Sequence, residues 1–217
     1  MSRDEFMRRW EELPELKNAE LIDGIVYMSS SVTTLHSTYD SHLAGWLRQY
    51  AWATPGCECG NNGTWLMIES APQPDTAVWI LPEYGGKSKY KGAYNSGAPE
   101  LAIEICASTA TQDLRSKLAL YQRAGVREYL TLVLEPCEVV WRTLVGGRYV
   151  PLKAGADGVL KSRVFPGLWL DQAAAIGADG PLVEAVLRKG LASRAHAAFV
   201  RALQARKKCR VRAASGP

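Results

Sequence analysis

Three charged side chains in this sequence form a set that could hydrolyse a phosphodiester with the help of a metal ion. Asp75 begins one apolar segment, Glu104 lies inside the next, and Lys117 follows shortly after it. Mg²⁺ prefers oxygen ligands and commonly takes one or two carboxylates, with water and substrate phosphate in its other positions. The metal lowers the pKa of a bound water, and an ammonium can orient that water or stabilise charge on the phosphorus. Asp75, Glu104 and Lys117 are therefore candidate catalytic residues.

Glu104 is the least expected of the three, because it interrupts LAIEIC, an apolar run with the composition of a central strand. Alternation along a strand places Glu104 between Ala102 and Cys106 on one face, while the branched aliphatic residues take the other face. A carboxylate is rarely buried unless a cation, a metal or a proton compensates for its lost water. Two interpretations stay open: a ligand presented into a cleft, or one Glu on an ordinary half-exposed face.

Asp75 and Lys117 also have ordinary explanations when each is taken alone. Asp75 is typical of a turn or of the start of a strand. Lys117 stands four residues after Asp113, where the two side chains could form an ion pair along a helix. The order Asp, then Glu on the next strand, then a nearby Lys is what favours a shared catalytic role.

The elements that must position these residues follow from periodicity and turn signals. Residues 3 to 13 and 34 to 53 have helical apolar patterns, and Asp23-Gly24 in AELIDGIVYMS predicts a hairpin with a type I′ turn. CECGNNGTWLMI predicts two strands around an Asn-Gly turn, and PQPDTAVWI predicts a turn followed by a strand. We interpret residues 81 to 99 as one long loop.

The second half of the chain predicts a crossover unit. A strand over 100 to 106 leads into a helix that stops at Gly125, and three further strands follow, separated by a Pro turn and a Gly-Gly turn. Strand, helix, strand is a parallel crossover, so we expect a mixed sheet. Residues 181 to 208 predict one or two basic amphipathic helices, interrupted near Gly190.

Composition places the chain among soluble globular proteins. It has 217 residues, of which 47% are hydrophobic and 22% are charged. No apolar stretch approaches the length of a membrane span and the N-terminus lacks the apolar core of a signal peptide, so we expect a cytoplasmic protein without a membrane partner. The five cysteines are scattered and lack zinc-ligand spacing from any histidine, which indicates reduced thiols.

The net charge of +4 is unevenly distributed. From Pro181 onward there are nine basic residues against one acid, Glu184, which leaves the rest of the chain acidic. Such a tail, like a loop with interleaved lysines and tyrosines, could bind nucleic acid, although a solvated surface is the alternative for both. The candidate nucleic-acid-binding residues are Lys87, Lys89, Lys91, Tyr90, Arg201, Lys207 and Lys208.

Several motifs resemble a known family. Asp75 in PQPD, Glu104 in LAIEICAST, and DLRSKLALYQRAGVREYL are similar to the PD-(D/E)XK nuclease superfamily and, within it, to the bacterial Uma-type putative restriction endonucleases. The similarity also includes AELIDGIVYM, the helix containing His36, and VFPGLWLD, and it runs over about residues 3 to 172. The basic tail lies outside it.

The resemblance implies an α/β (α+β) fold: a restriction-endonuclease-like mixed β-sheet core flanked by helices, here with a basic C-terminal helical tail. We divide the chain into a nuclease-like domain over 1–176 and a basic helical extension over 177–217. The resemblance also implies that Asp75 and Glu104 are metal ligands and that Glu20 is an additional catalytic acid.

Lys117 is, by the same resemblance, the catalytic lysine moved from the strand onto the following helix. At the usual lysine position, two residues after the Glu, this chain has Cys106, so the catalytic set depends on Lys117. Relatives have Ser-Pro after this strand and a Tyr-Trp with a following Asp, where this chain has Cys106-Ala107-Ser108 and Tyr129-Leu130. These differences lie outside the implied metal ligands.

The leading hypothesis is a Mg²⁺-dependent endonuclease acting on DNA, with Mn²⁺ able to substitute and a homodimer expected by resemblance. A catalytically weak or inactive nuclease-fold module that binds nucleic acid is the alternative. A third hypothesis gives the C-terminal amphipathic helix a role in protein interaction. Metal-dependent cleavage separates the first two, as does the effect of salt on binding, since phosphate contacts weaken steeply with ionic strength.

Overall fold

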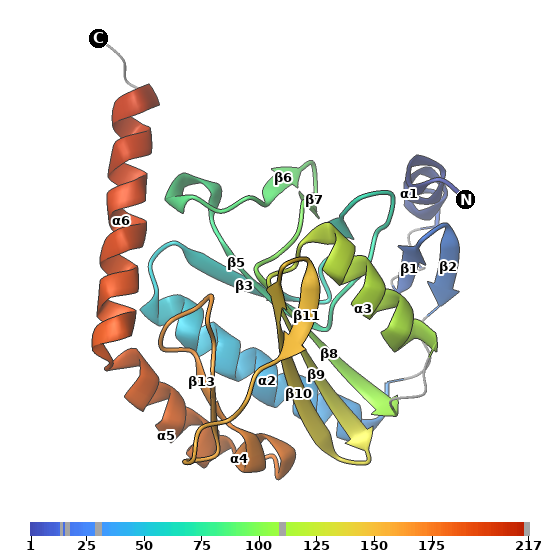
Figure 1. Ribbon diagram of the computed structural model, residues 1–217. Coiled ribbons are helices and arrows are strands. Elements are labelled where there is room, and N and C mark those ends of the chain that lie inside the picture. The colour runs from blue at the N-terminus through green and yellow to red at the C-terminus, as the bar shows by residue number, and fades with distance from the viewer. Residues whose placement is uncertain (14, 16–17, 29–31, 109–111, 215–217) are drawn as a thin grey trace.

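The computed structural model describes the chain except for residues 14, 16–17, 29–31, 109–111 and 215–217 (Figure 1). The chain begins with helix α1 (Arg3–Glu11), which ends two residues before the end of the predicted helix over 3 to 13. A hairpin of β1 (Ala19–Ile22) and β2 (Ile25–Met28) follows. Its turn residues Asp23 and Gly24 have φ of 50° and 81°, the positive values that a type I′ turn requires, so the predicted hairpin is confirmed.

A mixed six-stranded sheet forms the centre of the molecule, with strand order β11-β10-β9-β8-β5-β3. Within the described strands of this sheet, only β8 and β9 pair in parallel, and helix α3 (Gln112–Ala124) crosses over between them. Gly125, with φ of 82°, ends that helix as predicted. The strands are β3 (Cys57–Asn61), β5 (Thr76–Ile80), β8 (Leu101–Ser108), β9 (Glu128–Glu135), β10 (Glu138–Val145) and β11 (Arg148–Pro151).

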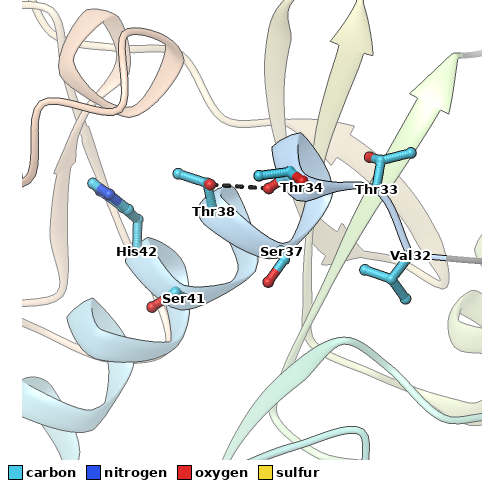
Figure 2. A pocket seen from close by; sticks show the side chains of 7 residues that line it. All are labelled: Val32, Thr33, Thr34, Ser37, Thr38, Ser41 and His42. Atoms are coloured by element: carbon cyan, nitrogen blue, oxygen red, sulfur yellow. Dashed lines mark hydrogen bonds between the residues drawn. The ribbon is translucent and has the colours of Figure 1, made fainter.

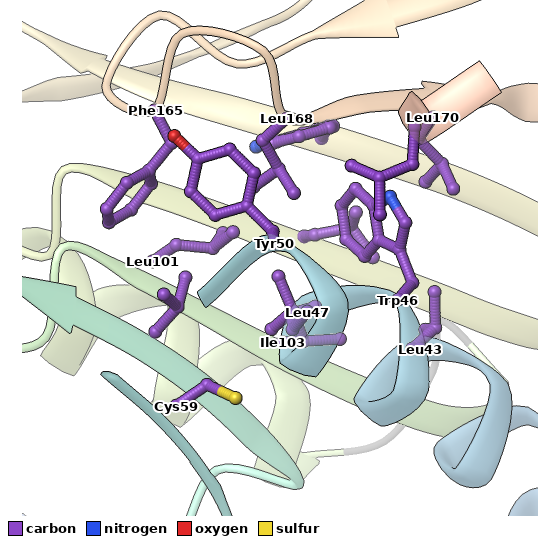
Figure 3. Packing of buried hydrophobic residues seen from close by; sticks show 14 of the residues in the cluster. Leu43, Trp46, Leu47, Tyr50, Cys59, Leu101, Ile103, Phe165, Leu168 and Leu170 are labelled. Atoms are coloured by element: carbon purple, nitrogen blue, oxygen red, sulfur yellow. The ribbon is translucent and has the colours of Figure 1, made fainter. Parts of the chain in front are cut away.

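Helix α2 (Thr34–Ala53) covers one face of this sheet. Its apolar stripe, which includes Leu43, Leu47 and Tyr50, packs against Leu101 and Ile103 of β8 (Figure 3). The small hairpin of β12 (Val159–Lys161) and β13 (Trp169–Asp171) and the short helix α4 (Gln172–Ile176) complete this layer. The prediction that the branched aliphatic residues of this strand lie together on the face opposite Glu104 is therefore confirmed.

Helix α3 covers the opposite face. Leu120 and Tyr121 of α3 share a buried cluster with Trp79 of β5 and Ala102 of β8. Because side chains alternate along β8, Glu104 points to this α3 side of the sheet, together with Ala102. The site thus lies between the sheet and α3.

The region between residues 57 and 99 differs from the prediction in two respects. First, β3 and β4 (Trp65–Leu66) do not pair with each other: β3 pairs with β5, and β4 pairs with β7 (Tyr94–Ser96). The cause is the burial of Cys57 and Cys59, whose face of β3 matches the apolar face of β5 rather than a local hairpin.

Second, residues 81–99 are not simply a loop. They contain the 3₁₀ helix η1 (Pro82–Tyr84) and a hairpin of β6 (Lys89–Lys91) with β7. The strands are short and β6 is exposed, so they lack the alternation of apolar and polar residues by which a strand is recognised in a sequence.

The C-terminal segment forms α5 (Gly180–Leu191) and α6 (Arg194–Ala214). The break falls at Ala192 and Ser193 and not at Gly190, which stays helical. A Cβ on Gly190 would lie 2.2 Å from the Gly167 carbonyl oxygen, so glycine here allows α5 to approach the segment before β13. Among the described residues, no helix is long and apolar enough to cross a membrane.

Two helical glycines give opposite predictions for the same substitution. Gly190→Ala should destabilise the protein by about 1–3 kcal/mol, because the added methyl group collides with the Gly167 backbone. Gly45→Ala in α2 should stabilise it by about 0.5–1 kcal/mol, because a Cβ there meets nothing within 4 Å and alanine favours the helix. Urea unfolding of both variants measures the difference, and equal shifts would contradict this packing of α5.

Candidate active site

Asp75, the residue before β5, lies opposite Glu104 of the neighbouring antiparallel strand β8. In the β5–β8 pair, Thr76 is the partner of Ile103, so one further step in this register brings Asp75 opposite Glu104. Residues in this relation point to the same face with Cβ atoms about 5 Å apart. Asp75 Oδ2 also accepts a hydrogen bond from the Ile105 backbone N–H, at 2.7 Å. Both predicted metal ligands therefore lie side by side on the α3 side of the sheet.

Two residues of α3, one helical turn apart, bind the two oxygens of Glu104. Lys117 Nζ lies 3.0 Å from Oε2, and the Tyr121 hydroxyl donates to Oε1 at 2.7 Å. Glu104 and Lys117 are each only 5% exposed. The interpretation of Glu104 as a carboxylate on a half-exposed face is therefore wrong. The Asp113 side chain, the other partner considered for Lys117, lies outside the described side chains.

Glu20 of β1 is the third carboxylate of the site. Its Oε2 lies 2.9 Å from Lys117 Nζ, and its other oxygen accepts a hydrogen bond from the Gln73 backbone N–H. The hairpin thus approaches the segment that leads to Asp75, and a bridge between Leu21 and Ala71 holds it there. Lys117 is shared between Glu20 and Glu104.

Electrostatics favours a divalent cation in this cluster. Burial raises the pKa of Glu104 well above its usual range, and the nearby Asp75 and Glu20 raise it further, while the Lys117 ammonium acts in the opposite direction. Glu20 and Glu104 share one ammonium and Asp75 lies beside Glu104, so ionising all three carboxyl groups leaves an excess of negative charge. A divalent ion between Asp75 and Glu104 would neutralise that excess.

The donor set fits a hard metal ion that keeps water ligands. Among the described residues, no three His, Cys, Asp or Glu side chains are placed so that they could hold a metal by themselves. Asp75 and Glu104 form a pair of oxygen donors, which is the protein contribution that Mg²⁺ commonly uses, with water and phosphate in the other positions. Asp75 is the more accessible of the two, since its side chain is 17% exposed.

Helix α2 brings two further residues to the entrance of the site. His36 Nε2 lies 3.4 Å from Asp75 Oδ1, and hydrogen bonding to Asp75 raises the pKa of His36. Asp40, one turn later, accepts a hydrogen bond from the Thr76 hydroxyl at 3.2 Å, and burial followed by repulsion from Asp75 raises its pKa. The sequence indicated neither role, because both depend on the packing of α2 at the end of β5.

One hollow in the described part of the chain lies along the first turns of α2. It has a volume of about 590 Å³ and is lined by residues from Val32 to His42, chiefly hydroxyl-bearing side chains (Figure 2). Ser37 and Ser41 follow each other at one-turn spacing on a side of α2 that His36 and Asp40 do not share. We therefore do not assign this hollow to the carboxylate site.

No contact joins the candidate nucleic-acid-binding residues to the carboxylates in the described part of the chain. Lys87, Lys89 and Lys91 are exposed in and before β6, where Tyr90 is 63% exposed. Arg201, Lys207 and Lys208 are exposed on α6, which stands on the opposite side of the molecule from β1 and β2 (Figure 1). The structure does not bring either group into contact with Glu104.

Tyr121 is a candidate functional residue that was not predicted from the sequence. Its helical spacing from Leu114 and Leu118 puts it on the apolar face of α3, where its ring packs, but its hydroxyl reaches Glu104. The signal was the interval of four residues between Lys117 and Tyr121, which puts both side chains on one helical face. Cys106, at the usual lysine position, is half-buried, and its thiol lies 3.7 Å from the Leu132 carbonyl oxygen.

A mixed sheet between helices, with paired acidic residues and a lysine from the crossover helix, is the arrangement that the motifs predicted for a PD-(D/E)XK-type protein. Residues 3–173 match the model of the Uma2 family, whose description is "Putative restriction endonuclease". The chain therefore belongs to this family, and the membership supports a nuclease function.

The fold is also similar to that of a solved protein. The crystal structure of a putative nuclease belonging to DUF820 from Anabaena variabilis matches with a TM-score of 0.60 and 15% sequence identity, over 76% of this chain and 90% of that chain. This likeness confirms the predicted fold, a restriction-endonuclease-like mixed sheet flanked by helices. A search of curated proteins finds no match.

The raised pKa of Glu104 predicts a pH-dependent stability. A carboxyl group with a higher pKa in the folded than in the unfolded chain stabilises the fold at low pH, and this stabilisation is lost as the pH rises above the usual value of 4.5 towards the raised one. Without divalent cations, the free energy of unfolding of the wild type should fall more between about pH 5 and pH 8 than that of Glu104→Gln.

Urea unfolding in EDTA at several pH values measures this difference. The exposed Glu138, changed to Gln, is the matched control and should follow the wild type. Parallel curves for the wild type and Glu104→Gln would show that Glu104 binds its proton equally well in the folded and unfolded chains.

Proposed function

We propose that this chain is a Mg²⁺-dependent endonuclease that hydrolyses phosphodiester bonds in DNA. The observation that carries the proposal is the pairing of Asp75 with the buried Glu104, to which the Lys117 ammonium is bound. A nuclease that uses a bound metal ion for hydrolysis needs oxygen ligands for the metal, a cation near the charge that develops on the phosphate, and access for the phosphate to the site. Membership of a family described as "Putative restriction endonuclease" supports both the reaction and DNA as the substrate.

Each side chain has a definable part in the proposed reaction. Asp75 and Glu104 would hold Mg²⁺, which supplies a water of lowered pKa and neutralises charge on the phosphate. Lys117 would donate to the attacking water or to a phosphate oxygen from the α3 side. Glu20 would hold the ammonium in place, since its Oε2 lies 2.9 Å from Lys117 Nζ. This gives Glu20 a positioning part beside the acid role that the resemblance implies.

A nucleic-acid-binding module without efficient cleavage is the second candidate. One observation favours it: Lys117 and Tyr121 already bind both oxygens of Glu104, so the cluster is largely satisfied as it stands. In that case DNA would bind and the phosphodiester would stay intact with or without a metal.

Cleavage of supercoiled plasmid by the purified protein tests the proposal. Nicking or linearisation should require Mg²⁺ or Mn²⁺ and stop in EDTA. Asp75→Asn and Lys117→Ala should each lower the rate at least about 100-fold, because each removes charge stabilisation at the reacting phosphate. Lys153→Ala removes an exposed lysine outside the site and should cleave like the wild type.

Two outcomes would contradict the endonuclease. Equal residual cleavage by all the variants would identify a contaminating nuclease. No cleavage of plasmid, linear duplex or single-stranded DNA, with DNA still bound, would favour the binding module.

The Tyr121 hydroxyl should lower the Mg²⁺ concentration that cleavage requires. Tyr121→Phe removes the hydrogen bond that orients Glu104, so the Mg²⁺ concentration for half-maximal cleavage should rise about 10-fold, as is typical when a residue behind a metal ligand is lost. Tyr129→Phe is the matched control: its ring centroid lies 5.2 Å from that of Tyr121, and its hydroxyl has no hydrogen-bond partner in the described structure. The same shift in both variants would assign the effect to packing.

A further inference from the structure

Helix α6 carries its positive charge on two different sides. Arg194–Ala214 contains seven basic residues and no acidic residue. Helical spacing separates six of them into an inner row, on the side of the buried Leu203, and an outer row on the opposite side. The inner row is Arg206, Lys207 and Arg210; the outer row is Arg194, Arg201 and Lys208.

The inner row anchors the helix to η1. Lys207 Nζ lies 4.8 Å from the centroid of the Tyr84 ring and donates to the Tyr84 hydroxyl at 3.2 Å. Arg210 donates to the Pro82 carbonyl oxygen, and the Arg206 side chain passes close to Gly85. A lysine over an aromatic ring and an arginine on a carbonyl are stabilising contacts within the protein. The inner row is therefore already used in holding α6.

The outer row has no such contacts. Arg194, Arg201 and Lys208 are all exposed, and among the described residues none of them has an ion-pair or hydrogen-bond partner. They follow one another at intervals of seven residues, which is nearly two helical turns, so they form a line of cations about 10.5 Å apart. Leu203 and His196, both buried, mark the opposite side of the helix.

We propose that the outer row of α6 binds the phosphate backbone of duplex DNA, away from the bond that is cut. The proposal rests on the proposed function, because it takes DNA as the substrate. A line of unpaired cations on a helix without acids is complementary to a polyanion, and the anchored inner row presents it rigidly. In this assignment Lys207, a candidate from the sequence, holds the helix, while Arg201 and Lys208 bind the phosphates.

The position of α6 allows the outer row to contribute to DNA affinity without taking part in the hydrolysis. Its anchor at Pro82 follows the end of β5, whereas Asp75 precedes the start of that strand. Five residues of extended chain, at about 3.3 Å each, put roughly 16 Å between the two ends of β5. Arg201 and Lys208 therefore contribute to binding without contacting the reacting phosphate, and their loss should raise KM and leave kcat unchanged.

Binding to a fluorescent duplex of about 30 base pairs, titrated with NaCl in EDTA, tests the outer row, since such a duplex is much longer than the row. Each lost phosphate contact should lower the slope of log Kd against log salt by about 0.9, so Arg201→Gln/Lys208→Gln should lower it by about 2. Arg148→Gln/Lys153→Gln removes the same charge from exposed positions in and after β11 and should keep the wild-type slope. Thermal unfolding should be the same for both.

The outcomes distinguish this proposal from the nuclease itself. An unchanged salt slope in the α6 variant, or an equal decrease of the slope in both double variants, would overturn the proposal that the outer row is a specific DNA-binding surface. This holds whatever the result of the cleavage assay. A lowered slope without any cleavage by the wild type would support the row while the nuclease fails. Tighter binding to phosphatidylserine vesicles than to DNA, lost in the α6 variant, would also overturn it.

Discussion

The antiparallel pairing of β5 with β8 is the constraint on which the site depends. It places two carboxylates opposite each other on one face of a buried sheet, which neither strand could do alone. Two ionised carboxylates on directly opposite residues repel by several kcal/mol at the dielectric of a protein interior. The strand pairing therefore requires other groups that offset this repulsion. The Lys117 ammonium and the Tyr121 hydroxyl supply part of that compensation from α3, and Ile105 supplies a backbone donor.

The rest of the fold keeps this cluster in place. The aliphatic face of β8 packs on α2 in a continuous apolar core, which fixes the strand from the other side (Figure 3). Because side chains alternate, the same strand can bury its apolar side chains on one face and present Glu104 on the other. The β1–β2 hairpin then closes the cluster through Glu20, whose contact with the Gln73 backbone links it to the segment before Asp75. Rigid scaffolding of this kind is what a metal site requires.

Local patterns in the sequence predicted the framework and the principal residues, and the missed features depend on long-range contacts. The hairpin at Asp23-Gly24 and the stop at Gly125 follow from backbone conformations that few other residues adopt. The face of Glu104 follows from alternation alone. By contrast, Tyr121 looked apolar because the hydroxyl of a tyrosine leaves no trace in periodicity. Gly190 looked like a helix break because the carbonyl that it accommodates belongs to Gly167, far earlier in the chain.

The part of the chain after the family match adds positive charge, carried by α6, to a core that is acidic. The cluster of Asp75, Glu104 and Glu20 is acidic and therefore does not attract a polyanion, and the first 180 residues as a whole carry more acids than bases. Helix α6 carries the opposite charge, and Leu203 and the contact of Lys207 with Tyr84 hold it against the core. An acidic centre needs a metal before a phosphate can approach, whereas a basic helix attracts phosphate without one. In the proposed function, attraction of DNA and hydrolysis of its backbone are therefore carried by separate elements, joined through η1 and β5.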